Sequence, residues 1–124
     1  MLLAIVDDDG DVRLALARLL RSLGHEVRLF VSAEDFEAAN VSVDCAILDV
    51  RLAGISGPEL RDRLRARPVP TPVVFITGNS DPKRAELSGA PDAPSLAKPL
   101  EEATLMAAIA DAIESSRPRT DHAF

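Results

Sequence analysis

Four polar residues that could take part in chemistry each come at the end of a short apolar run: Asp7, Asp49, Thr77 and Lys98. Asp8 adds a second carboxylate beside the first of them. Carboxylates that lie close together repel one another unless a hard divalent cation binds between them. Mg²⁺ suits a site made of one or two carboxylates, waters and a phosphate group. A lysine offers a compact positive charge to phosphate oxygens, and a threonine hydroxyl can donate a hydrogen bond.

Taken together, these residue types indicate a site for phosphoryl transfer. Catalysis of that reaction consists mainly of positioning the reactants and neutralising charge. One of the carboxylates can act as the nucleophile and form an acyl phosphate. The hypothesis requires that residues far apart in the sequence meet at one place in the fold.

Apolar runs and amphipathic patterns alternate along the chain. Strands are predicted at 2–6, 25–30, 43–48, 73–76 and 94–97, and those at 2–6 and 43–48 are continuous apolar runs that indicate buried strands. Helices are predicted at 12–23, 32–39, 56–64 and 100–115. Pro94 places the last strand at a sheet edge, because proline cannot donate a backbone hydrogen bond. Asp9 and Asp11 are interpreted as capping or surface residues of the first helix.

This alternation predicts a parallel sheet with helices on both faces and right-handed crossovers. Ligands of an open parallel sheet bind outside the carboxyl ends of its strands. The four polar residues end the first, third, fourth and fifth strands, so we expect them to converge at one edge of the sheet.

The composition bounds the class of protein. A chain of 124 residues, 47% of them hydrophobic, suits one compact domain. Its net charge of −6 argues against direct contact with nucleic acid, which needs a basic face. Cys45 is the single cysteine, so an internal disulfide is excluded and a cytoplasmic location fits. Cys45 itself is interpreted as a small buried hydrophobe. No apolar run approaches the roughly 20 residues that span a bilayer, so no membrane partner is expected.

From residue 2 to about residue 115, the chain resembles the CheY-like receiver domains of two-component response regulators. The resemblance rests on the order and spacing of four motifs, which are IVDDD at 5–9, DCAILDVRLAGISGPEL at 44–60, VVFITG at 73–78 and KP at 98–99. It implies a doubly wound, flavodoxin-like fold: a five-stranded parallel sheet in the strand order 2-1-3-4-5. It also implies a receiver domain over 1–116 and a flexible tail over 117–124.

The resemblance assigns roles to individual residues. It implies that Asp49 is phosphorylated, that Thr77 is the switch hydroxyl and that Lys98 binds the phosphate. The ligands that it implies for Mg²⁺ are the carboxylates of Asp7, Asp8 and Asp49 and the main-chain carbonyl of Arg51.

The function implied by the resemblance is a phosphorylation switch. A sensor histidine kinase or a phosphotransfer protein would present phosphohistidine to Asp49. The chain would catalyse only its own phosphorylation and dephosphorylation, and would not be an enzyme in any other sense. The added charge would rearrange the region of Thr77 and change a surface for an unidentified downstream protein. We expect output through protein contacts, and a homodimer stays open as an alternative.

Departures from the family pattern concern the output side. Ser95 stands where the family usually has an aromatic residue, Leu100 where it commonly has phenylalanine, and Ala53 where a proline is common. Prolines and glycines crowd the region 78–94, so its fourth helix is predicted to be short or irregular. The receiving pocket is complete in the sequence, whereas the usual route of read-out is altered.

Two other functions remain as alternatives. In a haloacid-dehalogenase-like phosphatase Asp7 would be the nucleophile, since DDDG at 7–10 follows an apolar strand and resembles the DxD motif of that family. The chain is short for that fold, and Asp11 stands where threonine or valine is usual.

A receiver-like interaction module that is never phosphorylated would explain the altered output region, but the intact pocket argues against it.

Overall fold

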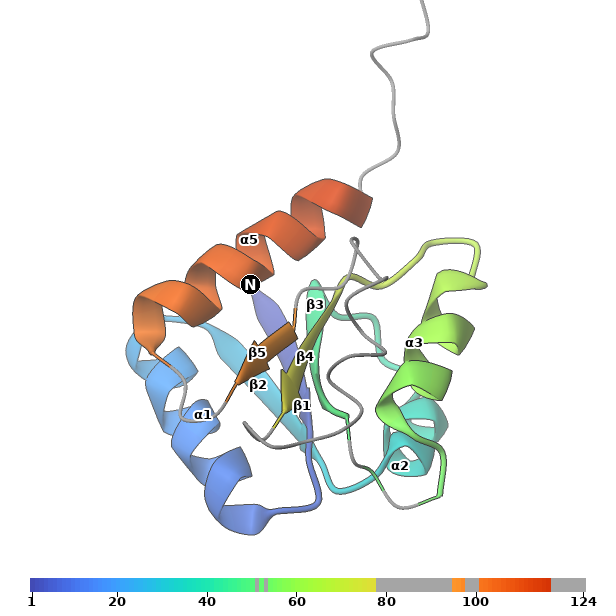
Figure 1. Cartoon of the computed structure of the whole chain (residues 1–124), viewed down its shortest axis with the longest axis horizontal. Helices are drawn as coiled ribbons and strands as arrows, with labels where there is room; N and C mark the ends of the chain where they lie inside the picture. The colour runs from blue at the N-terminus through green and yellow to red at the C-terminus, as the bar shows by residue number, and fades with distance from the viewer. Residues whose placement is uncertain (51, 53, 78–94, 98–100, 117–124) are drawn as a thin grey trace, which may run out of the picture.

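The computed structural model describes residues 1–50, 52, 54–77, 95–97 and 101–116. The strands are β1 (Leu2–Val6), β2 (Glu26–Phe30), β3 (Cys45–Asp49), β4 (Val73–Thr77) and β5 (Ser95–Ala97). The helices are α1 (Gly10–Ser22), α2 (Ala33–Ala39), α3 (Gly57–Arg65) and α5 (Glu102–Ser116). All strand pairs are parallel, in the order β2-β1-β3-β4-β5. The predicted α/β fold with a parallel sheet is thus confirmed (Figure 1).

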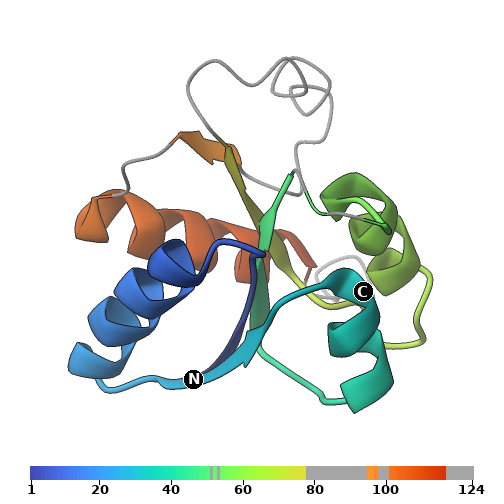
Figure 2. The same ribbon diagram turned by 90° about the horizontal axis from the view of Figure 1, so that it is seen from below.

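Helices cover both faces of the sheet, with α1 and α5 on one face and α2 and α3 on the other (Figure 2). Successive strand side chains point to opposite faces. In β1, Leu3 and Ile5 join the buried cluster beneath α1 and α5, whereas Ala4 and Val6 join the cluster beneath α2 and α3. Because both faces are covered, β1 is apolar throughout, and β3 and β4 are apolar up to their last residues, so these three strands form continuous apolar runs in the sequence. β2 differs, because Glu26 and Arg28 are exposed.

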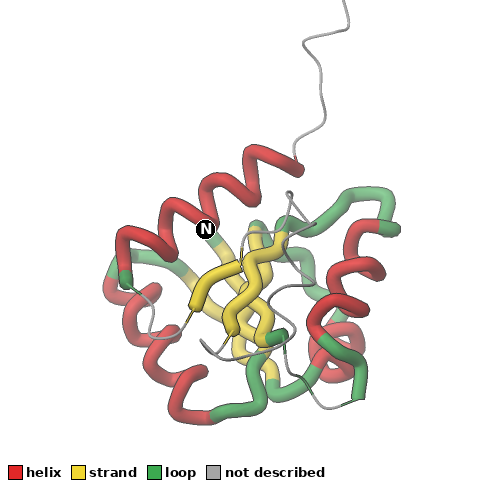
Figure 3. Tube along the Cα trace, in the orientation of Figure 1, coloured by secondary structure: helices red, strands yellow, loops and turns green. Residues whose placement is uncertain are grey.

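Two of the helix starts are capped by serine. Ser32 accepts a hydrogen bond from the backbone N–H of Asp35 at 3.0 Å, and Ser56 accepts one from that of Glu59 at 3.2 Å. Each bond satisfies one of the N–H groups that a helix start leaves without a partner inside the helix. The caps fix where α2 and α3 begin, after the loops that follow β2 and β3 (Figure 3).

β5 is short and lies at the edge of the sheet, where Pro94 led us to expect it. It pairs with β4, with Ala97 opposite Thr77. The predicted fourth helix in 78–94 and the predicted tail over 117–124 lie outside the described residues. Among the helices that the structure describes, none has both the length and the apolar character needed to cross a membrane.

Cys45 is fully buried at the start of β3, which agrees with its interpretation as a small hydrophobe. Burial, reinforced by the negative charge of Asp44, raises the pKa of its thiol from 9.0 to about 12. Since only the thiolate reacts, we expect the folded protein at pH 8 to resist the thiol reagent DTNB and the unfolded protein to react fully. Absorbance of the released thiol measures this, and rapid labelling of the folded protein would contradict the burial.

Candidate functional site

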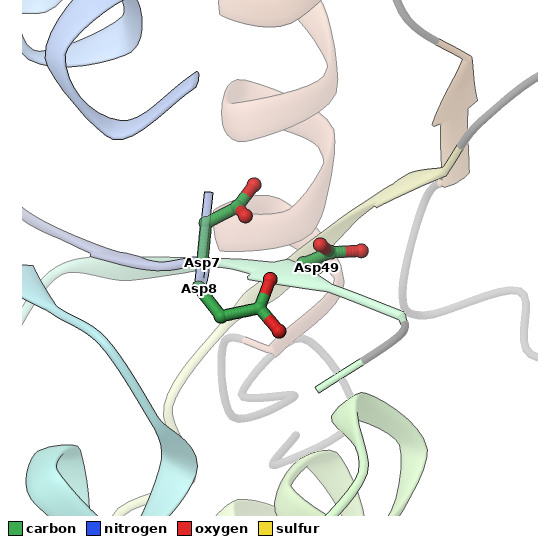
Figure 4. Close-up of side chains that lie close together, drawn as sticks. All are labelled: Asp7, Asp8 and Asp49. Carbon is green, nitrogen blue, oxygen red and sulfur yellow. The ribbon is translucent and has the colours of Figure 1, made fainter. Parts of the chain in front are cut away.

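Three carboxylates gather at the edge of the sheet formed by the carboxyl ends of its strands. Asp7 and Asp8 follow β1, and Asp49 is the last residue of β3. These strands are hydrogen-bonded neighbours, with Val6 opposite Leu48, so the residues that follow lie side by side. One carboxylate oxygen of each aspartate lies within 4.8 Å of the other two (Figure 4). The convergence predicted from strand ends is therefore observed for Asp7 and Asp49, with Asp8 beside them.

The site combines buried and exposed carboxylates. Asp7 is 0% exposed and Asp49 is 7% exposed, whereas Asp8 is exposed. Burying a carboxylate is unfavourable unless it is paired or hydrogen-bonded, and Asp7 Oδ1 accepts a hydrogen bond from the Asp9 N–H at 2.8 Å. The exposure of Asp8 leaves one side of the cluster open to solvent, from which an ion or a phosphoryl donor can approach.

Asp9 has a different role, because its side chain is directed to the helix rather than to the cluster. It is the N-cap of α1, and its Oδ1 accepts hydrogen bonds from the backbone N–H groups of Asp11 at 2.9 Å and Val12 at 3.4 Å. Its interpretation as a capping residue is confirmed. This cap explains why α1 begins at Gly10, earlier than the apolar pattern predicts.

Thr77 ends β4, the strand on the other side of β3 from β1. Asp49 pairs with Ile76, so Thr77 comes one residue beyond Asp49 in the register of the sheet. It is fully buried, and its hydroxyl has no hydrogen-bond partner among the described residues. Since a buried hydroxyl without a partner is unfavourable, this hydroxyl is suited to donate to a ligand at the same edge.

The other two predicted site residues, Arg51 and Lys98, lie outside the described residues. The carboxylates that are described supply only oxygen ligands, which is the donor chemistry that Mg²⁺ prefers. Oxygens that share one Mg²⁺ lie no more than about 4 Å apart, so the observed spacing needs little adjustment to hold such an ion. The residues therefore fit the expected metal.

Gly57 is a residue of the site that the sequence analysis missed. It opens α3, its backbone N–H donates to the carbonyl of Val50 at 3.4 Å, and it packs on the backbone of Asp49. A Cβ atom at this position would lie 2.6 Å from the carbonyl oxygen of Asp49. A side chain at this position would therefore displace the end of β3, and with it the Asp49 carboxylate. Its only signal in the sequence was a glycine between a helix cap and a proline.

We expect Gly57→Ala to lower the free energy of unfolding by about 2 kcal/mol, because the added methyl group overpacks the backbone of Asp49. Gly10→Ala makes the same change at the first residue of α1, where the new Cβ would lie 3.4 Å from the flexible Arg13 side chain. That variant should be as stable as the wild type or gain up to about 1 kcal/mol. Urea unfolding followed by circular dichroism compares the two, and equal stabilities would show that the close contact is unimportant.

Comparison with known sequences agrees with this geometry. A family model described as the response regulator receiver domain matches residues 3–110. Nodulation protein W of Bradyrhizobium diazoefficiens is 36% identical over 122 residues, covering 94% of this chain and 53% of that protein. The transcriptional regulatory protein FixJ of Azorhizobium caulinodans is 41% identical over 108 residues, covering 85% of this chain and 51% of that protein. The chain thus spans about half the length of these curated relatives.

Solved structures extend the similarity to the fold. A response regulator receiver protein from Burkholderia phymatum superposes with a TM-score of 0.76 at 30% identity, covering 95% of this chain and 98% of that one. Full-length FixJ from B. japonicum gives a TM-score of 0.80 at 35% identity, covering 94% of this chain and 59% of that one. The similarity therefore extends over nearly all of this chain.

Proposed function

The chain belongs to the response regulator receiver domain family, and on this basis we propose that it is a phosphorylation switch whose acceptor is Asp49. The observation that supports this most is the gathering of three carboxylates within 4.8 Å at the ends of β1 and β3. The order of the strands supports the choice among them. β3 lies between β1 and β4, so Asp49 has the pair Asp7 and Asp8 on one side and Thr77 on the other.

In the proposed reaction, a carboxylate oxygen of Asp49 forms a bond to the phosphorus of a phosphohistidine donor. The phosphorus–nitrogen bond breaks, and the imidazole of the donor keeps the electron pair. We propose that the Thr77 hydroxyl donates a hydrogen bond to one phosphoryl oxygen and that the Lys98 ammonium pairs with another. The product is an acyl phosphate on the protein itself, so the chain acts on no other substrate.

The proposed metal ligands are the carboxylates of Asp7, Asp8 and Asp49 and the main-chain carbonyl of Arg51. Bound Mg²⁺ would neutralise charge on the phosphoryl oxygens. The aspartates would hold the ion, and Asp7 would keep it beside the acceptor, because the Asp7 carboxylate is buried and lies within 4.8 Å of that of Asp49. Without an ion, the negative charge of the cluster would repel an incoming phosphoryl group.

The proposed donor is a sensor histidine kinase or a phosphotransfer protein, and the proposed output is a contact with a downstream protein. The FixJ relatives are named transcriptional regulatory proteins, and this chain spans about half their length. We propose that the receiver does not itself contact DNA, because its net charge of −6 opposes binding to a phosphate backbone.

Intact-mass analysis of the wild-type protein after incubation with acetyl phosphate and Mg²⁺ tests this function. The expected result is a gain of one phosphoryl group, which is absent when EDTA replaces Mg²⁺. No gain under conditions that label a control receiver, with a cognate kinase also failing, would overturn the switch and leave an unphosphorylated interaction module. Peptide mapping that places the label on Asp7 would instead support a phosphatase.

A further inference from the structure

Arg13 links α1 to the turn that carries the two adjacent aspartates. It lies in the first turns of α1 and is half-buried, and its Nη1 donates a hydrogen bond to the main-chain carbonyl of Asp7 at 2.6 Å. This carbonyl belongs to the peptide group that joins Asp7 to Asp8. Its orientation therefore affects the directions in which both carboxylates point.

Other hydrogen bonds hold the rest of the turn, and the carbonyl of Asp7 is the group that the Arg13 side chain contacts. The backbone N–H of Asp7 donates to the carbonyl of Phe30 in β2 at 3.1 Å, so β2 holds one side of the residue. The guanidinium of Arg13 holds the other side. The backbone N–H of Arg13 donates to the carbonyl of Asp9 at 3.0 Å, which anchors the arginine to the same turn.

The guanidinium of Arg13 extends past the start of α1 to reach the turn. A Cβ atom on Gly10 would lie 3.4 Å from its Nη2, which is ordinary van der Waals contact, so the arrangement does not require glycine at that position.

We propose that Arg13 is a positioning residue for the Mg²⁺ site, acting through the backbone of Asp7. This role rests on the proposed function, since it concerns the same ion. Groups that orient metal ligands from outside the ligand shell typically change metal affinity by about 10- to 100-fold. Positioning by Arg13 therefore predicts weaker Mg²⁺ binding when the guanidinium is removed.

The charge of Arg13 predicts the opposite change in Mg²⁺ affinity. A guanidinium beside a cation site repels the cation, so if charge dominated, its removal would tighten Mg²⁺ binding. A purely structural role predicts a third result, in which the free energy of unfolding falls but the Mg²⁺ affinity of the folded protein stays the same. The three roles can therefore be separated by measuring affinity and stability together.

The experiment compares Arg13→Met, Arg13→Lys and the wild type by calorimetric titration with MgCl₂ and by urea unfolding in EDTA. Methionine keeps an apolar stem but loses the donor and the charge, and we expect it to weaken Mg²⁺ binding at least about tenfold. Lysine can still donate to the carbonyl of Asp7, so it should recover most of the affinity. Arg18→Met removes the same charge from an exposed position of α1 and should bind within about twofold of the wild type.

Equal or tighter Mg²⁺ binding by Arg13→Met would overturn the positioning role while leaving the metal site intact. A wild-type protein that binds no Mg²⁺ would overturn the proposed site, and this role with it. If Arg13→Met does not fold, Arg13→Leu, which also lacks the donor and the charge, replaces it in the same titration and the same limits apply.

Discussion

Asp49→Ala is expected to take up no phosphoryl group from acetyl phosphate in the presence of Mg²⁺, while the wild-type protein gains one. The reason is that the carboxylate of Asp49 is the proposed nucleophile, and alanine has no group that can form the acyl phosphate. Intact-mass analysis of both proteins under the same conditions measures the effect.

Asp9→Ala is the matched control, because it removes a carboxylate only two residues from Asp7. Asp9 caps α1 and is not one of the three gathered carboxylates, so its loss should cost about 1 kcal/mol of stability and leave uptake unchanged. Uptake by Asp49→Ala would contradict the assignment of the acceptor. Loss of uptake in Asp9→Ala, if that variant is folded, would show that the cluster is larger than the structure indicates.

Mg²⁺ is expected to raise the free energy of unfolding of the wild-type protein and to leave that of Asp7→Asn unchanged. A ligand that binds only the folded state stabilises it by about 2.7 kcal/mol at 100 times its dissociation constant. Asparagine keeps the shape of Asp7 and can accept the hydrogen bond from the Asp9 N–H, but it lacks the charge that attracts the ion. Urea unfolding in MgCl₂ and in EDTA, followed by circular dichroism, gives both values.

Asp9→Asn provides the control for this second comparison. Asparagine is as good an N-cap as aspartate, so α1 should be unaffected and the stabilisation by Mg²⁺ should be retained in full. If Mg²⁺ raised the free energy of unfolding of Asp7→Asn as much as that of the wild type, the ion would bind elsewhere. If Mg²⁺ stabilised neither Asp7→Asn nor Asp9→Asn, the total charge of the turn rather than Asp7 would determine binding of the ion.

The described residues include four of the six residues proposed for the site that would receive the phosphoryl group, all but Arg51 and Lys98. The ends of β1, β3 and β4 are in place there, with three carboxylates and a buried hydroxyl. Of the departures from the family pattern, Ser95 belongs to β5, while Ala53 and Leu100 lie outside the described residues. The altered read-out inferred from these residues stays a prediction.

The sequence by itself determined which segments are buried strands and which polar residues end them. Strands covered on both faces are almost wholly apolar, so β1, β3 and β4 can be read as short apolar runs that stop at Asp7, Asp49 and Thr77. The cap at Asp9 was equally readable, because capping depends on a residue and its next three neighbours. Local chemistry of this kind does not depend on the rest of the fold.

Which of these strand ends meet depends on the order of the strands in the sheet, which the alternation of strands and helices does not fix. The order 2-1-3-4-5 was expected from the family resemblance, and the tertiary structure shows β3 between β1 and β4, which brings Asp49 beside Asp7. The contacts of Arg13 with the carbonyl of Asp7 and of Gly57 with that of Asp49 were also invisible in the sequence. Periodicity reports the face on which a side chain lies. It does not report how closely two backbones approach, because strand order and loop geometry set that distance. The acidic residues were therefore identified from the sequence, and the groups that hold them in place from the fold.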